Sequence, residues 1–161
     1  MSDNARKLLR HPAGWIACGF GSGLSPRAPG TVGSLLALLP WWLWLRELPP
    51  WQYALVLGCA FALGVWAADW AITKLDRQDP GVVVCDEFVG LWLALLLAPP
   101  GWPWMLAGFA LFRLFDIWKP WPVRWADQQV HGGFGTMLDD LLAGAYAFAV
   151  LQLSGMLISR L

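Results

Sequence analysis

Residues 51–72 read WQYALVLGCAFALGVWAADWAI, an apolar run whose length decides the fold class. The 21 residues from Leu48 to Ala68 include no Asp, Glu, Lys or Arg. A transmembrane helix needs roughly 20 apolar residues to cross about 30 Å of hydrocarbon, so this run is long enough to span a bilayer. The run at 139–159, which ends in 19 uncharged residues, passes the same test.

The composition of the whole chain also suits an apolar environment. Of its 161 residues, 58% are hydrophobic and 14% are charged, whereas a soluble domain is typically about 25% charged. Eleven basic residues balance eleven acidic ones, which excludes the excess positive charge of a nucleic-acid-binding protein. Cys18, Cys59 and Cys85 lack the spacing of a metal or redox site and are expected to be packing residues. The length suits a single domain over 1–161.

Apolar runs between Pro and Gly breakers predict five helical segments and no strand. We therefore expect an all-α, compact, membrane-embedded bundle with short outer turns and longer cytoplasmic loops. Three segments are short for a span and would have to extend through uncharged flanks or thin the bilayer. A soluble, unusually apolar helical bundle is the alternative. The predicted segments are 31–45 with Pro40 inside, 51–72, 86–98, 104–118 and 139–159.

The positions of the basic residues predict an orientation in the membrane. If the five segments alternate across a bilayer, nine Lys and Arg fall on one side and only Arg46 and Arg160 on the other. Cytoplasmic loops carry the excess of Lys and Arg, so the nine-cation side is predicted to be cytoplasmic. Tryptophans gather near both ends of the apolar runs, as expected for two belts of rings at the depth of the lipid headgroups, with core filling as the alternative for any single ring. On the predicted cytoplasmic side they are Trp15, Trp70, Trp118, Trp121 and Trp125.

Ten of the eleven acidic residues fall on the same predicted side, many of them beside helix ends. Mg2+ prefers oxygen ligands and is commonly held by one or two carboxylates together with substrate phosphate oxygens. Carboxylates from several helix ends could therefore form a metal site. The alternative for Asp86 and Asp139 is capping of the helices that they begin.

The segment FRLFDIWKPWP, residues 112–122, combines both charges on one predicted helix end. Arg113, Asp116 and Lys119 recur every three residues and therefore lie along one face of a helix. A guanidinium and an ammonium beside a carboxylate suit recognition of a phosphate next to a metal. The alternative is an interfacial helix whose cations reach lipid headgroups.

Two glycine-rich stretches lie on the same predicted side, GFGSGLSPRAPGTVGS at 19–34 and HGGFGTM at 131–137. Backbone amides in loops at helix N-termini can bind an anion, although neither string is a known nucleotide-binding motif. In the first stretch, Gly30, Thr31 and Ser34 are candidate substrate contacts. Flexible turns without a ligand are the alternative.

Taken together, GFGSGLSP, PGTVGS, DEFVG, FRLFDIWKPWP and HGGFGTMLDDLLAG resemble the phosphatidylglycerophosphatase A family, in order and over nearly the whole chain. The resemblance implies an all-helical lipid phosphatase of the bacterial inner membrane with its active site facing the cytoplasm. It implies Mg2+-dependent hydrolysis of phosphatidylglycerophosphate to phosphatidylglycerol and inorganic phosphate. The family's acidic motifs match Asp79, Asp86, Glu87, Asp116, Asp139 and Asp140, and its phosphate-contacting cations match Arg113 and Lys119.

Roles within this set follow from chemistry. Asp79, Asp86, Glu87, Asp139 and Asp140 are the candidate ligands of Mg2+. Arg113 and Lys119 would take charge on the transferred phosphate, and Asp139 is a further candidate catalytic residue. Asp116 would activate water, with a transient aspartyl phosphate as the alternative to direct attack by water. A carboxylate-lined ion or solute transporter is the alternative function, because carboxylates inside membranes also mark ion routes.

Overall fold

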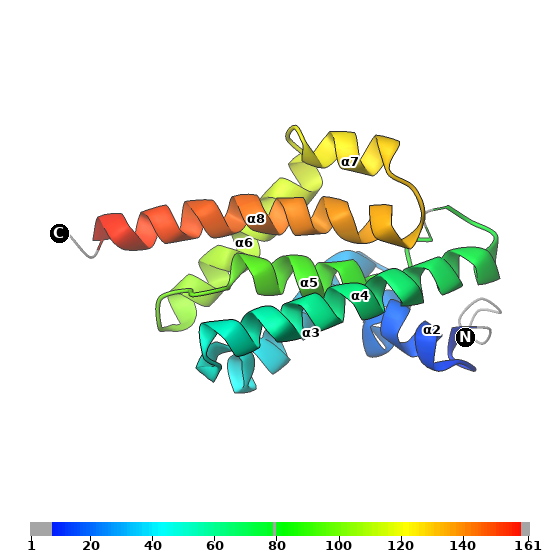
Figure 1. Ribbon diagram of the computed structural model, residues 1–161, viewed down its shortest axis with the longest axis horizontal. Coiled ribbons are helices and arrows are strands. Elements are labelled where there is room, and N and C mark those ends of the chain that lie inside the picture. The colour runs from blue at the N-terminus through cyan, green and yellow to red at the C-terminus, as the bar shows by residue number, and fades with distance from the viewer. Residues whose placement is uncertain (1–7, 79, 159–161) are drawn as a thin grey trace.

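A computed structural model describes residues 8–78 and 80–158, and this part of the chain contains helices and no strands. The long axis of the molecule follows α8, and α4 lies along it on one side (Figure 1). The helices are α2 (Pro12–Ala17), η1 (Gly19–Leu24), α3 (Pro29–Leu43), η2 (Leu45–Glu47), α4 (Pro50–Leu75), α5 (Cys85–Ala94), α6 (Trp102–Trp118), α7 (Val123–Gln129) and α8 (Gly132–Ile158).

Each of the five predicted segments is a helix, and Pro40 lies inside α3 as expected. The boundary that differs most is the start of α8, which begins at Gly132 although the sequence predicts a glycine-rich loop over 131–137. The loop prediction is wrong because Gly133 packs directly on α4, where its amide donates to Oδ1 of Asp69 at 2.5 Å. The short helices α2, η1 and α7 were not predicted.

The centre of the bundle is α5, which packs against α3, α4, α6 and α8. Glycines allow the closest of these approaches. A Cβ atom on Gly144 of α8 would lie 2.2 Å from the carbonyl oxygen of Gly90 in α5. The side of α5 that faces α6 is filled by Phe112, whose side chain is fully buried. The backbones of α5 and α8 are therefore in direct contact.

Two helices, α4 and α8, are long and apolar enough to cross a membrane, at 26 and 27 residues. Only 22% of the most apolar window of each is buried inside the protein. A core helix of a soluble protein would bury most of such a window, whereas these helices expose large apolar side chains such as Leu55, Leu63 and Leu153. At 10 residues, α5 is shorter than the roughly 20 residues of an ordinary span, as the sequence predicts for this segment.

The cysteines are free thiols with different environments. Cys18 and Cys85 are buried, as expected for packing residues, but Cys59 is exposed on α4. The prediction for Cys59 is therefore wrong, because its position on α4 faces away from the bundle rather than into it.

Candidate functional site

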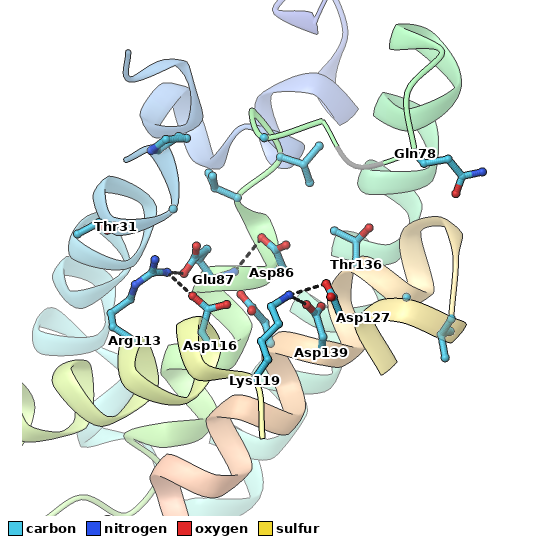
Figure 2. A pocket seen from close by; sticks show the side chains of 18 of the residues that line it. Thr31, Gln78, Asp86, Glu87, Arg113, Asp116, Lys119, Asp127, Thr136 and Asp139 are labelled. Carbon is cyan, nitrogen blue, oxygen red and sulfur yellow. Dashed lines mark hydrogen bonds and ion pairs between the residues drawn. The ribbon is translucent and has the colours of Figure 1, made fainter. Parts of the chain in front are cut away.

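A cavity of about 610 Å³ lies where α5 begins, α6 ends and α8 makes its first turns. Figure 2 shows charged side chains from these helices pointing toward one another across it. Two cations, Arg113 and Lys119, face a larger group of carboxylates. The carboxylates that line the cavity are Asp86, Glu87, Asp116, Asp127, Asp139 and Asp140.

The end of α6 supplies the cationic wall, as the three-residue spacing of FRLFDIWKPWP predicts. Arg113 and Asp116 lie in the last turns of the helix, and an ion pair of 2.8 Å joins them. Lys119 ends the helix in a left-handed conformation (φ 47°), and its amide donates to the carbonyl oxygen of Phe115 at 2.9 Å. This turn directs the chain toward α7 and keeps Lys119 at the cavity.

Arg113 forms ion pairs with two of the carboxylates of the cavity, Glu87 and Asp116. Its Nη1 atom donates to Glu87 of α5 and forms the ion pair with Asp116. Glu87 also accepts a hydrogen bond of 2.6 Å from the hydroxyl of Ser34, which is fully buried. A Cβ atom on Gly30 would lie 2.0 Å from Oε1 of Glu87, so only glycine leaves room for this carboxylate. Ser34 and Gly30 thus fix the position of Glu87.

Lys119 forms ion pairs with two other carboxylates of the cavity, Asp127 and Asp139. Its ammonium donates to Asp127 of α7 at 2.5 Å and to Asp139 of α8 at 2.8 Å. Partial burial alone would lower the pKa of Lys119, but the hydrogen bonds to Asp127 and Asp139 outweigh it and raise this pKa above its usual value. Lys119 therefore stays charged at any physiological pH.

Asp86 and Asp140 make no ion pair with a cation in the described part of the chain. Asp86 accepts a hydrogen bond of 2.9 Å from the amide of Glu87, and Asp140 is only 4% exposed. Asp140 is buried and Asp86 is half-buried, and a carboxylate in such a position without a positive partner is costly because it loses hydration. Two such carboxylates on neighbouring helices fit a hard divalent cation, since Mg2+ commonly takes one or two carboxylates and completes its shell with water and phosphate oxygens.

The predicted shell of five ligands is not gathered at one point. Within residues 8–78 and 80–158, no three His, Cys, Asp or Glu side chains stand close enough to hold a metal by themselves. Glu87 and Asp139 face cations instead, and Asp79 lies outside the described residues. Capping is wrong for Asp139, which lies in the third turn of α8, whereas Asp86 does lie in the first turn of α5.

The glycine-rich stretches reach the cavity in part. Gly30 and Thr31, in the first turn of α3, line it, and so do His131 and Gly132. Ser34 does not line it, because it is buried behind Glu87. The prediction that Ser34 contacts substrate is therefore replaced by a role in positioning Glu87.

Sequence reasoning missed Asp127 and Asp69. Asp127 pairs with Lys119 across the turn between α6 and α7, and Asp69 receives the amide of Gly133 at the start of α8. Neither pairing has a periodic signal, because eight residues and a proline-containing turn separate Asp127 from Lys119, and 64 residues separate Asp69 from Gly133. The DQQ string at 127–129 is the hint that the sequence offers, as a polar segment in the same predicted cytoplasmic loop as Lys119.

Comparisons with known proteins agree on one family. A family model described as Phosphatidylglycerophosphatase A matches residues 15–154. The chain is 44% identical over 157 residues to phosphatidylglycerophosphatase A of Escherichia coli, which covers 95% of this chain and 90% of that protein. It is 41% identical over 144 residues to the Haemophilus influenzae enzyme of the same name, with 89% and 88% covered.

A Bacteroides thetaiotaomicron protein, named as a candidate phosphatidylinositol-3-phosphatase, is 43% identical over 145 residues, with 86% of this chain and 91% of that protein covered. No solved structure matches the chain. The match extends from α2 into the last turns of α8 and so includes every described residue that lines the cavity. On this evidence the chain belongs to the phosphatidylglycerophosphatase A family.

Proposed function

We propose that this protein is a Mg2+-dependent lipid phosphatase that hydrolyses phosphatidylglycerophosphate to phosphatidylglycerol and inorganic phosphate. The observation that carries the proposal is the cavity, in which two cations lie beside two carboxylates that have no cationic partner among the described residues. A phosphomonoester needs positive charge around its oxygens, and hydrolysis depends chiefly on positioning and electrostatic stabilisation. The relatives named above share a substrate type in their names, a phospholipid with a phosphate on its headgroup.

Arg113 and Lys119 would bind the terminal phosphate with the hydrogen-bond donors that they have left. Lys119 gives two of its three N–H groups to Asp127 and Asp139, which leaves one. Arg113 makes its contacts to Glu87 and Asp116 through Nη1, so Nη2 remains for a phosphate oxygen. Their carboxylate partners hold both cations in place before substrate arrives, so little reorganisation is needed on binding.

Asp86 and Asp140 are the residues that would hold Mg2+, and Asp79, Glu87 and Asp139 remain proposed members of the wider ligand set. When bound, Mg2+ would neutralise phosphate charge and orient the phosphate for attack. The fit rests on the chemistry of two carboxylates at the wall of the cavity that pair with no cation in the part of the chain that the structure describes.

Asp116 is the residue that we assign to accept the proton of the attacking water. Its side chain is 15% exposed at the cavity and is held by Arg113 at 2.8 Å. A general base must lie within hydrogen-bond reach of the water and of the reacting phosphate, and a carboxylate fixed beside a phosphate-binding guanidinium meets that requirement. Besides its proposed place in the wider ligand set, Asp139 fixes the ammonium of Lys119.

We place the protein in the bacterial inner membrane with several crossings and with the cavity at its cytoplasmic face. The support is the charge asymmetry of nine cations against two, together with the exposed apolar surfaces of α4 and α8. A lipid could then reach the cavity from the bilayer while its acyl chains stay in the hydrocarbon. The transporter alternative finds no support in the family comparisons.

The test is phosphate release from phosphatidylglycerophosphate by the detergent-purified protein, with and without EDTA. Asp86→Asn and Asp140→Asn should each lower the rate by at least about 10- to 100-fold. A loss of about this size is typical when a group that only supports a metal ligand is removed, so loss of a ligand itself should cost no less. Glu47→Gln is the matched control, because Glu47 is an exposed carboxylate of η2 outside the cavity. Full activity of both Asn variants, or full activity in EDTA, would contradict the metal assignment.

A further inference from the structure

A second cavity, of about 460 Å³, lies beside the first, between the end of α6 and α7. Three tryptophans, Trp118, Trp121 and Trp125, line it together with Arg124 and Lys119. We call it the tryptophan groove. Of these residues, only Lys119 has a role in the function proposed above.

The tryptophan groove has the composition of a site at lipid headgroup depth. The three tryptophans are 63%, 79% and 51% exposed. Tryptophan is favoured where its ring meets lipid and its N–H meets water. Arg124 is exposed and makes no ion pair in the described part of the chain, whereas its neighbour Asp127 is already paired with Lys119. The groove therefore offers one unpaired cation among aromatic rings.

The groove is held in a fixed shape. The hydroxyl of Tyr146 in α8 donates to the carbonyl oxygen of Trp121 at 2.8 Å and so ties the turn to the bundle. Val123 and Ala126 are fully buried and anchor α7, which lies along α8 (Figure 1). The exposed rings and Arg124 are thus presented by a rigid support.

Lys119 lines both the groove and the catalytic cavity. A ligand that passes this side chain can occupy both spaces at once. The proposed substrate has two anionic groups on either side of one glycerol, a terminal phosphomonoester and a phosphodiester that leads to the diacylglycerol. The protein offers cations in the same order, Lys119 and Arg113 at the cavity and Arg124 in the groove.

We propose that the tryptophan groove binds the phosphodiester end of the lipid, with Arg124 paired to the phosphodiester and the tryptophan rings against the first part of the acyl chains. This inference rests on the proposed function and adds to it the residues that distinguish a phospholipid from a small phosphate ester. Arg124 is a binding residue for the part of the lipid that does not react.

The experiment measures kinetics of Arg124→Gln with phosphatidylglycerophosphate in neutral detergent micelles. Removing a charged hydrogen-bond partner should raise KM about tenfold and leave kcat unchanged. Arg77→Gln is the matched control, since Arg77 is an exposed cation of the same predicted side that lines neither cavity. Its KM should change less than twofold. That change measures how much any exposed cation on this side of the protein helps to attract an anionic lipid.

Inhibition by the two products separates the two sites. Phosphatidylglycerol carries only the phosphodiester, and inorganic phosphate resembles only the transferred group. Arg124→Gln should raise the inhibition constant of phosphatidylglycerol about tenfold and leave that of inorganic phosphate unchanged. The inference is overturned if Arg124→Gln matches Arg77→Gln, or if phosphatidylglycerol does not inhibit the unaltered protein. Absence of phosphate release from the unaltered protein would overturn the proposed function as well.

Discussion

Gly144→Ala should greatly lower the phosphatase rate, because it forces apart the helices α5 and α8 where their backbones touch. The added Cβ would lie 2.2 Å from the carbonyl oxygen of Gly90, whereas ordinary contact begins at 3.4 Å. The two helices must therefore separate by about 1 Å. Gly144 lies four residues after Asp140, and Gly90 lies four residues after Asp86, so the contact is one helical turn from each carboxylate. A separation at the glycines would move the two proposed metal ligands apart.

The expected loss follows from that displacement. A shift of about 1 Å in a catalytic group costs about 100-fold in rate. Overpacking of this kind lowers the free energy of unfolding by about 1–3 kcal/mol, so most of the variant stays folded at 25 °C if the parent has ordinary stability. The assay is Mg2+-dependent phosphate release from phosphatidylglycerophosphate, with thermal unfolding in the same detergent to confirm that the variant is folded.

Two further glycine variants complete the test. Gly90→Ala should behave like Gly144→Ala, because its Cβ would lie 2.6 Å from the carbonyl oxygen of Asp140. Gly58→Ala is the control, since its Cβ would meet nothing within 4 Å on the exposed side of α4. It should keep full activity and gain up to about 1 kcal/mol from better helix propensity. A folded Gly144→Ala protein with more than half of the normal rate would refute the reasoning.

Three other outcomes are expected. Arg113→Leu leaves the buried carboxylate of Glu87 unpaired and should lower the free energy of unfolding by about 3–5 kcal/mol; an unchanged melting temperature in detergent would contradict this. Because the pKa of Lys119 is raised in the folded protein, its stabilising charge is present below the unfolded pKa of about 10.4 and is lost only as pH rises further. The melting-temperature difference between the unaltered protein and Lys119→Met should therefore persist from about pH 7 to 9, and a difference that disappears in this range would contradict the pairing. N-ethylmaleimide should label neither Cys18 nor Cys85 in the folded protein, as mass spectrometry would show; rapid labelling of either buried cysteine would contradict the packing.

Most of the fold could be predicted because it depends on local sequence. The apolar runs that became α4 and α8 exceed the length of a membrane span, and the runs of α3, α5 and α6 end at breakers that the sequence displays. The start of α8 could not be predicted. Its glycines suggest a loop, but a Cβ on Gly133 would lie 2.2 Å from the carbonyl oxygen of Val65, so glycine serves close packing there.

Some features of the candidate site could likewise be predicted from local sequence, whereas others depend on how the helices pack. The sequence by itself determined that Arg113, Asp116 and Lys119 lie along one helix face, because a three-residue spacing is a local property of the α-helix. Only the tertiary structure decided that Arg113 pairs with Glu87, that Lys119 pairs with Asp139, and that Asp86 and Asp140 have no cationic partner among residues 8–78 and 80–158. The physical reason is that α5, α6 and α8 approach one another through side-chain packing and glycine contacts. Which opposite charges meet depends on that packing, and spacing along the chain does not record it.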